Sequence, residues 1–170
     1  DRTLDIYFID VEGGQSTLIV SPAGESLLVD TGYAGNGGRD PGRIVAAARA
    51  AGIGQIDYLL ITHFHGDHVG GVPELATQIP IVTFVDHGAP PQNPDPRVLE
   101  PFRAYAAVRA AGRHILARPG ERLPMTQAEV AASARISLPT LRALERGEGG
   151  VRALAAVMAV LDLRWGWAPD

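Results

Sequence analysis

Apolar runs separated by short polar stretches predict a set of strands. Residues 4–11, 16–20 and 26–30 are rich in Ile, Leu, Val and Phe and are bounded by Gly, Ser and Pro. This pattern predicts three successive strands joined by tight turns. Residues 56–61 form a nearly continuous apolar run, which is expected of a strand covered on both faces. A further strand is predicted at 81–85.

Helical spacing of apolar residues predicts three helices. The segment Pro41–Ala51 has this spacing and is punctuated by a proline at its start and a glycine after its end. A short helix is predicted at 72–79 and a longer one at 98–111, whereas the prolines of 87–97 predict a surface loop. A last short strand is predicted at 114–117. The expected buried stripe of the 98–111 helix is Leu99, Phe102, Ala106 and Val108.

Three histidines and one aspartate lie within six residues, directly after the predicted strand at 56–61. Neutral imidazoles and a hard carboxylate suit zinc or a similar first-row ion. In an extended or tightly turned loop, His63 and His65 would point to one side and Asp67 and His68 to the other, which gives two ligand pairs for two neighbouring ions. The alternative is a solvated histidine-rich loop. We expect turns in place of a helix at Gly66, Gly70 and Gly71.

Two residues that follow predicted strands are further candidates. If the strands at 56–61 and 81–85 are parallel, His87 emerges near the metal motif and is a candidate additional ligand or proton carrier. Its alternative is to cap the proline-rich loop. Asp30 ends a strand, and its carboxylate would hydrogen-bond the second nitrogen of a ligating histidine and fix its tautomer. Its alternative is ordinary turn chemistry. His114 is expected to be a packed or surface histidine.

Composition limits the class of protein. The 170 residues, 46% of them apolar, are enough for one ordinary domain or two small ones with a packed core. The absence of cysteine excludes disulfides and thiolate metal ligands. No stretch is long and apolar enough to span a bilayer. The formal charge of −4 argues against a protein that coats nucleic acid.

The sequence around the metal motif resembles the metallo-β-lactamase-fold hydrolases. The motif His63-x-His65-x-Asp67-His68, with two glycines after it, is similar to their metal-binding signature. Leu4–Ser16 resembles the opening of the branch related to the competence-type DNA-uptake proteins, and the segment 27–32 resembles the family's next marker. The resemblance runs from about residue 4 to about residue 124. It implies a partial αβ layer, in which a mixed sheet is flanked by helices.

This resemblance implies a zinc-dependent hydrolase. One or two zinc ions, or another first-row divalent metal, held by His63, His65, Asp67 and His68 would lower the pKa of a coordinated water from about 15.7 towards 7. The water would attack an ester, amide or phosphodiester bond, and Asp67 and His68 are the candidate catalytic residues. The family's second half supplies further ligands that have no match here. We therefore expect a truncated and chimeric chain of impaired activity, or one completed as a homodimer.

The character of the chain changes after Pro124. Residues 125–147 resemble the helix-turn-helix core of the phage-repressor (Cro/C1-type) DNA-binding family. The expected fold class is therefore α+β, with a metallo-β-lactamase-like domain at 1–124 and a small all-α segment at 125–170. The alternative is a helical cap that packs onto the first domain. The residues expected to face the major groove of double-stranded DNA are Leu138, Thr140 and Arg142.

Three possibilities therefore stay open. The first is a metallo-hydrolase, and the second is a helix-turn-helix transcriptional regulator with a vestigial metal-binding half. The third is a folded or partly folded remnant in which neither module works. The charge of residues 125–170 does not favour DNA binding, because five arginines are balanced by five acidic residues. The compartment follows the function: the cytoplasm suits the DNA-binding protein, and secretion or the periplasm suits the hydrolase.

Overall fold

The computed structural model describes residues 4–120, 135 and 139–140. The chain divides into two units, and every helix and strand named below lies in the unit made of Asp5–Val20 and Gly24–Glu121. A sheet whose six strands follow one another in chain order, from β1 to β6, forms the centre of this unit.

The first three strands form an antiparallel meander. They are β1 (Asp5–Phe8), β2 (Thr17–Val20) and β3 (Ser26–Val29), which confirms the strands predicted at these places. Each is shorter than the apolar run that predicted it. After β3, Asp30 takes a left-handed backbone conformation with φ 56°, which ends the strand and turns its side chain toward the next part of the chain.

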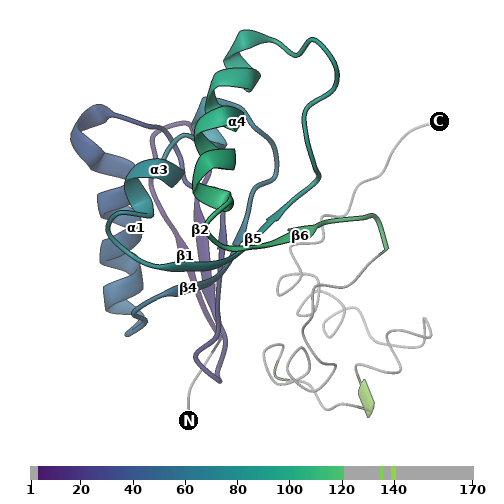
Figure 1. Cartoon of the computed structure of the whole chain (residues 1–170). Coiled ribbons are helices and arrows are strands. Elements are labelled where there is room, and N and C mark those ends of the chain that lie inside the picture. Colours follow the sequence, from purple (N-terminus) through teal and green to yellow (C-terminus); the bar gives the residue numbers. More distant parts are fainter. Residues whose placement is uncertain (1–3, 121–134, 136–138, 141–170) are drawn as a thin grey trace, which may run out of the picture. The chain divides into compact units, whose positions relative to one another are not determined.

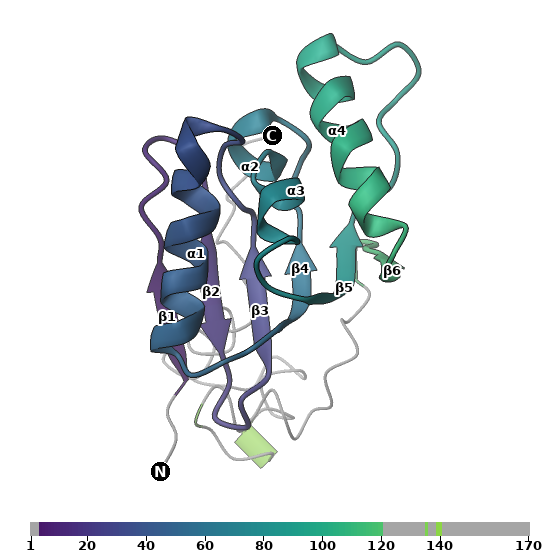
Figure 2. The same cartoon turned by 60° about the vertical axis from the view of Figure 1, so that its left-hand side comes forward.

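The remaining strands are parallel. The helix α1 (Arg39–Ala50), which follows a short 3-10 turn, leads from β3 to β4 (Ile56–Leu60), and the sheet continues with β5 (Ile81–Asp86) and β6 (Arg113–Leu116). The predicted parallel pairing of the strands at 56–61 and 81–85 is confirmed. In Figure 2 the arrows of β3, β4 and β5 point to the same edge, where α2 lies.

The expectation of turns in place of a helix around the metal motif was wrong. Residues Gly66–Val69 form α2, and Val72–Leu75 form α3, which is shorter than the helix predicted at 72–79. Gly70 and Gly71 have helical φ angles of −60° and −71°. They are required because other backbone lies against them: a Cβ atom on Gly70 would collide with the carbonyl oxygen of Gly66, and one on Gly71 with that of Thr31.

Helix α4 (Pro96–Arg109) begins before the predicted residue 98. Its first residue is a proline, which is tolerated at this position, and the Asp95 side chain caps the helix by accepting a hydrogen bond of 2.8 Å from the backbone N–H of Arg97. The predicted buried stripe was only partly correct, because Leu99, Phe102, Ala106 and Val108 are half-buried. The fully buried residue is Tyr105, whose ring packs inside while its hydroxyl finds a hydrogen-bond partner.

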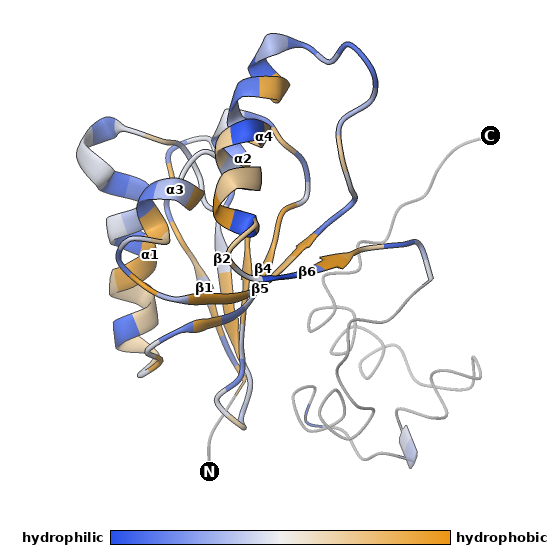
Figure 3. Cartoon of the chain, in the orientation of Figure 1, coloured by the Kyte–Doolittle hydropathy of each residue, from blue (hydrophilic) through white to orange (hydrophobic). Residues whose placement is uncertain are grey.

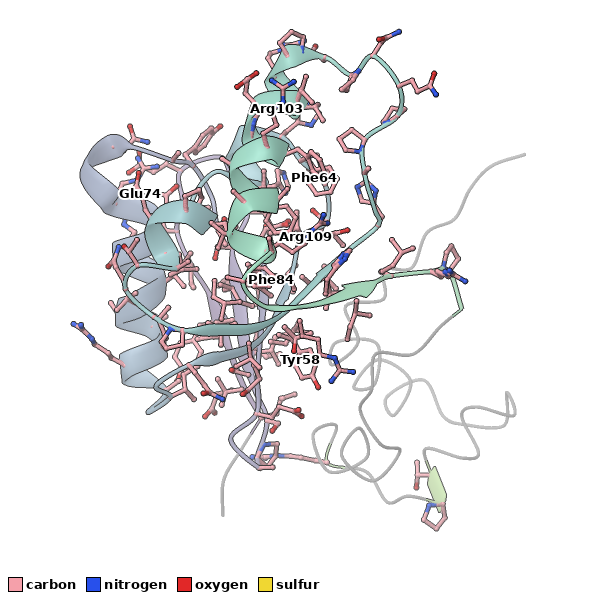
Figure 4. All side chains as sticks on the ribbon, in the orientation of Figure 1. Tyr58, Phe64, Glu74, Phe84, Arg103 and Arg109 are labelled. Atoms are coloured by element: carbon pink, nitrogen blue, oxygen red, sulfur yellow. The ribbon has the colours of Figure 1, made fainter. Side chains whose placement is uncertain are left out.

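Helices α1, α3 and α4 cover one face of the sheet (Figure 1). A row of cross-strand partners on that face, Leu18, Leu28, Leu59 and Phe84, forms the centre of the core. Figure 3 shows largely hydrophobic strands, whereas the helices carry alternating hydrophilic and hydrophobic bands. Tyr58 lies on the other side of the sheet (Figure 4). The predicted mixed sheet with flanking helices is therefore confirmed.

The predicted helix-turn-helix segment lies outside the described residues, apart from Arg135, Pro139 and Thr140. Leu138 and Arg142 are among the residues outside the description, while Thr140 is described and is half-buried. The boundary at Pro124, DNA binding, the homodimer and the compartment stay predictions. Among the described helices, none has the length and apolar character needed to cross a membrane.

Candidate metal centre

Three of the four predicted ligands come together where the carboxyl ends of the parallel strands meet. The ligand atoms of His63, Asp67 and His68 all lie within 4.8 Å of one another, and in the described part of the chain this is the group of acidic and histidine side chains with that spacing. The Nε2 atom of His68 is 3.5 Å from Oδ2 of Asp67. All three side chains are partly exposed, so a solute can reach them.

The grouping differs from the predicted ligand pairs. The ring centroids of His63 and His68 are 3.8 Å apart, whereas those of His63 and His65 are 5.0 Å apart. His65 is exposed and lies outside the group of three. The prediction assumed an extended loop, in which alternate side chains share a side. Because α2 is helical, that alternation does not apply to Asp67 and His68.

Asp30 is fully buried and contacts one of these histidines directly. Its Oδ2 atom is 2.8 Å from Nδ1 of His68 and accepts a 2.6 Å hydrogen bond from the Thr62 hydroxyl. Its Oδ1 atom accepts a 2.8 Å hydrogen bond from the backbone N–H of Thr62. A proton on Nδ1 leaves Nε2 of His68 with a free lone pair, on the side of the ring where the Asp67 carboxylate lies.

The protonation states are set by burial and by neighbours. Burial lowers the pKa of the His63 imidazole, and the nearby His68 and His65 lower it further, so the neutral form that binds metals is favoured. Burial raises the pKa of Asp30, although the hydrogen bonds from Thr62 and His68 act in the opposite direction. The carboxylate of Asp30 therefore depends on these donors to stay charged.

Two loops hold α2 in place through its backbone. The backbone N–H of Gln15 donates to the carbonyl of Asp67 at 3.1 Å, and that of Thr31 donates to the carbonyl of His68 at 2.7 Å. The Thr31 hydroxyl donates to the same His68 carbonyl at 3.1 Å. Sequence reasoning missed the roles of Thr31 and Thr62. Their position, next to Asp30 in one case and next to the metal motif in the other, was the available signal.

Phe64, between His63 and His65 in the chain, is 2% exposed and points into an aromatic cluster. Its ring centroid lies 4.7 Å from that of Phe102 and 4.8 Å from that of His87. His87 is exposed and outside the group of three, so its role as ligand or proton carrier stays a prediction. Figure 4 shows Phe64 beside α4, the helix that carries Arg109.

The donor set fits a divalent metal ion. Two imidazoles and a carboxylate form the three-ligand arrangement typical of a catalytic zinc site, which leaves further positions open for water or substrate. The buried Asp30 supplies the outer hydrogen bond that ligating histidines ordinarily make.

A comparison with known families identifies the fold. The sequence model of the metallo-beta-lactamase superfamily matches residues 9–152. The chain belongs to the metallo-beta-lactamase superfamily. The predicted resemblance is thereby confirmed at the level of the superfamily, while the competence-type branch stays a prediction. The match extends past the boundary that we predicted at residue 124.

Several curated relatives of this superfamily member are named as hydrolases or thioesterases. A UPF0173 metal-dependent hydrolase of Cupriavidus metallidurans is 32% identical over 80 residues, which are 47% of this chain and 26% of the relative. A hydroxyacylglutathione hydrolase of Stenotrophomonas maltophilia is 37% identical over 105 residues, 61% of this chain and 37% of the relative. An atrochrysone carboxyl ACP thioesterase of a Cryptosporiopsis species is 37% identical over 67 residues, 39% of this chain and 20% of the relative. The chain thus spans well under half the length of these curated relatives.

Solved structures give weaker likenesses. The Rm3 metallo-beta-lactamase is 26% identical, with a TM-score of 0.39 over 49% of this chain and 30% of that one. A Thermotoga maritima protein of the metallo-beta-lactamase type is 15% identical, with a TM-score of 0.43 over 93% of this chain and 91% of that one. Membership of the superfamily rests on the sequence match.

Proposed function

We propose that this superfamily member is a zinc-dependent hydrolase whose centre is built on His63, Asp67 and His68, with His65 as a fourth ligand. The observation that carries the proposal is the convergence of three ligand atoms within 4.8 Å, one of them on a histidine oriented by Asp30. A bound divalent ion supplies Lewis acidity, which makes water a stronger nucleophile near neutral pH and polarises the oxygen of a scissile bond.

The residues of the chain have separate roles in this proposal. Asp30 accepts a hydrogen bond from the protonated Nδ1 of His68 and so keeps Nε2 of that ring directed at the site. Thr62 donates to both oxygens of Asp30 and prevents that carboxylate from rotating. The Asp67 carboxylate, which is 31% exposed, orients the attacking water and accepts its proton, with His68 beside it.

The substrate class is proposed from the same site and from the relatives. An ester, an amide and a phosphodiester all present an oxygen that a metal ion polarises. Two of the relatives are named as a hydroxyacylglutathione hydrolase and an acyl carrier protein thioesterase. We therefore place acyl esters and thioesters first, ahead of amides and phosphodiesters.

Zinc content and esterase activity test this proposal together. The purified chain is loaded with zinc, desalted and assayed by elemental mass spectrometry, and its hydrolysis of an acyl thioester is followed with a thiol reagent. We expect at least one zinc per chain, and an Asp67→Asn, His68→Ala double variant that retains less than about a tenth of it, because ligand loss leaves an incomplete site.

Asp10→Asn is the matched control. Asp10 is an exposed carboxylate paired with Arg43 and makes no contact with the proposed ligands. It is expected to leave zinc content and hydrolysis unchanged. Equal zinc content in the double variant and in the control would overturn the proposed metal site. Zinc binding without hydrolysis would overturn the proposed hydrolase activity.

His65→Ala separates one ion from two. His65 lies outside the group of three, so its removal leaves those ligand atoms in place. If His65 serves a second ion, the variant binds one zinc fewer than the wild-type chain. An unchanged stoichiometry together with wild-type zinc affinity would remove His65 from the proposed ligand set.

A change at Asp30 tests the orienting hydrogen bond. We expect Asp30→Ala to weaken zinc binding by about 10- to 100-fold, as is typical for loss of the outer partner of a ligating histidine. Without the carboxylate, the Nδ1 proton of His68 has no acceptor at 2.8 Å, and the imidazole is free to change tautomer. Competition with a chromophoric chelator measures the dissociation constant.

Asp57→Ala is the comparison for this experiment. Asp57 accepts hydrogen bonds from the backbone N–H and hydroxyl of Ser26 at 2.8 and 2.9 Å, so it too is a carboxylate that joins neighbouring strands. It lies near the start of β4, at the edge opposite to the metal motif. Zinc affinity that falls equally in both variants would mean that Asp30 acts on general stability alone.

A further inference from the structure

A buried carboxylate outside the ligand set gathers an unusual number of donors. Asp86, the last residue of β5, is 1% exposed. Its Oδ2 atom accepts from the Tyr105 hydroxyl at 2.7 Å and from Arg109 at 2.6 Å, and it lies 3.1 Å from Nε2 of His114. Its Oδ1 atom accepts from the backbone N–H of Gly88 at 2.8 Å.

These contacts join three parts of the fold. Tyr105 and Arg109 belong to α4 and His114 belongs to β6, while Gly88 starts the loop after β5. Burial raises the pKa of Asp86, but the hydrogen bonds outweigh burial and hold it below its ordinary value, so the group is a carboxylate at neutral pH. A buried charge paired in this way is costly to disturb, because a removed partner leaves it uncompensated.

The anchored helix reaches the metal motif at two places. Tyr105 and Phe102 of α4 lie against Phe64, with ring centroids 5.8 and 4.7 Å from its own. Further along, α4 packs against α2, where Pro101 faces the position that a side chain on Gly66 would occupy. One helix therefore touches both Phe64, which separates His63 from His65, and the helix that carries Asp67 and His68.

Arg109 strengthens the same helix face. Its guanidinium lies 5.7 Å from the Phe102 ring and 5.4 Å from the Tyr105 ring, distances at which a cation is attracted to an aromatic face. The Phe102 and Tyr105 rings, which contact Phe64, are thus held in place by the Arg109 guanidinium, and Tyr105 also by its hydrogen bond to Asp86.

We propose that Asp86 is a positioning residue for the metal centre. Through Tyr105 and Arg109 it fixes α4, and α4 sets the distance between the histidines on either side of Phe64 and the two ligands on α2. The inference rests on the proposed metal binding. It assigns a function to a polar cluster outside the proposed ligand set. It also makes zinc affinity depend on the Tyr105 hydroxyl, which donates a hydrogen bond to Asp86.

Tyr105→Phe is the direct test, since it removes that hydroxyl and keeps the ring that packs on Phe64. Zinc dissociation constants are measured by chelator competition, and the visible absorption of the cobalt form reports ligand geometry. We expect zinc binding about five- to tenfold weaker than in the wild-type chain and an altered cobalt spectrum.

Val45→Ala is the matched control for destabilisation. Val45 is a buried residue of α1 and lies outside the aromatic cluster. Thermal unfolding midpoints of both variants are recorded, and affinities are compared at a temperature where both are folded. Weaker binding in Tyr105→Phe with wild-type affinity in Val45→Ala supports the inference. Equal affinities in the two variants overturn it.

Two further arms keep the outcome unambiguous. Arg109→Lys keeps the charge beside Asp86 but changes the contact geometry, and it is expected to weaken zinc binding as well. It replaces Tyr105→Phe as the test if that variant does not fold. A wild-type chain that binds no zinc overturns both the proposed function and this inference. If the wild-type chain binds zinc and the Tyr105→Phe and Arg109→Lys variants bind it with the same affinity, the inference alone is overturned.

Discussion

Replacing Phe64 by alanine is expected to lower the free energy of unfolding of the metal-free protein by about 3 to 5 kcal/mol. The ring is 2% exposed and lies among Phe102, Tyr105 and His87, so its removal leaves a cavity that the anchored helix α4 is poorly able to close. Urea denaturation followed by circular dichroism measures the change. The same variant is expected to bind zinc more weakly, because Phe64 separates His63 from His65.

Phe64→Leu provides the comparison. A leucine fills much of the volume without the aromatic contacts, and a swap of this kind between large apolar residues ordinarily costs less than about 1.5 kcal/mol. A stability loss below about 1 kcal/mol in Phe64→Ala would show that the ring is not part of the packed core, and the link between α4 and the metal motif would fail with it.

The strand pattern was predictable because burial on a sheet imposes a simple rule on sequence. The run at 56–61 is apolar at nearly every position, and three of its residues, Ile56, Leu59 and Ile61, are buried in the core. The meander at the start of the chain was equally clear. In each case the strand is shorter than its apolar run; β3 ends where Asp30 takes a left-handed backbone conformation.

The geometry around the ligands was not predictable to the same degree. Asp30 was chosen as a candidate for its place after a strand, and the structure puts its Oδ2 atom 2.8 Å from Nδ1 of His68. The separation of His65 from the other three candidate ligands was missed, since it depends on α2 being helical. Other backbone packs against Gly70 and Gly71, directly after that helix, and such long-range contacts are not contained in a one-dimensional pattern.

Tyr105 and Asp86 show a second limit of sequence reasoning. A stripe of apolar residues was expected to face the core, and Tyr105 was not among them; a buried tyrosine also needs a hydrogen-bond partner for its hydroxyl. The partner is Asp86, 19 residues earlier in the chain, and burial of the two groups is favourable only when they meet. Long-range polar pairs of this kind leave no local periodicity.

Gly71→Ala is expected to destabilise the protein by about 3 kcal/mol, at the upper end of the cost of adding a methyl group to packed structure. The new Cβ atom would collide with the carbonyl oxygen of Thr31 and lie 3.3 Å from its Cβ atom. The Thr31 backbone has little freedom to retreat, because its N–H donates to His68 at 2.7 Å and Gly71 itself donates to Gly32 at 3.1 Å. Chemical denaturation measures the loss.

Gly42→Ala is the matched control, because it makes the same chemical change with the opposite expected sign. Gly42 lies inside α1, and a Cβ atom there would meet nothing within 4 Å. Alanine is a better helix former than glycine, so a gain of about 0.5 to 1 kcal/mol is expected. A Gly71→Ala variant as stable as the wild-type chain would mean that the loop at Thr31 moves freely. The 2.7 Å hydrogen bond from Thr31 to His68 would then no longer explain how α2 is held at the metal centre.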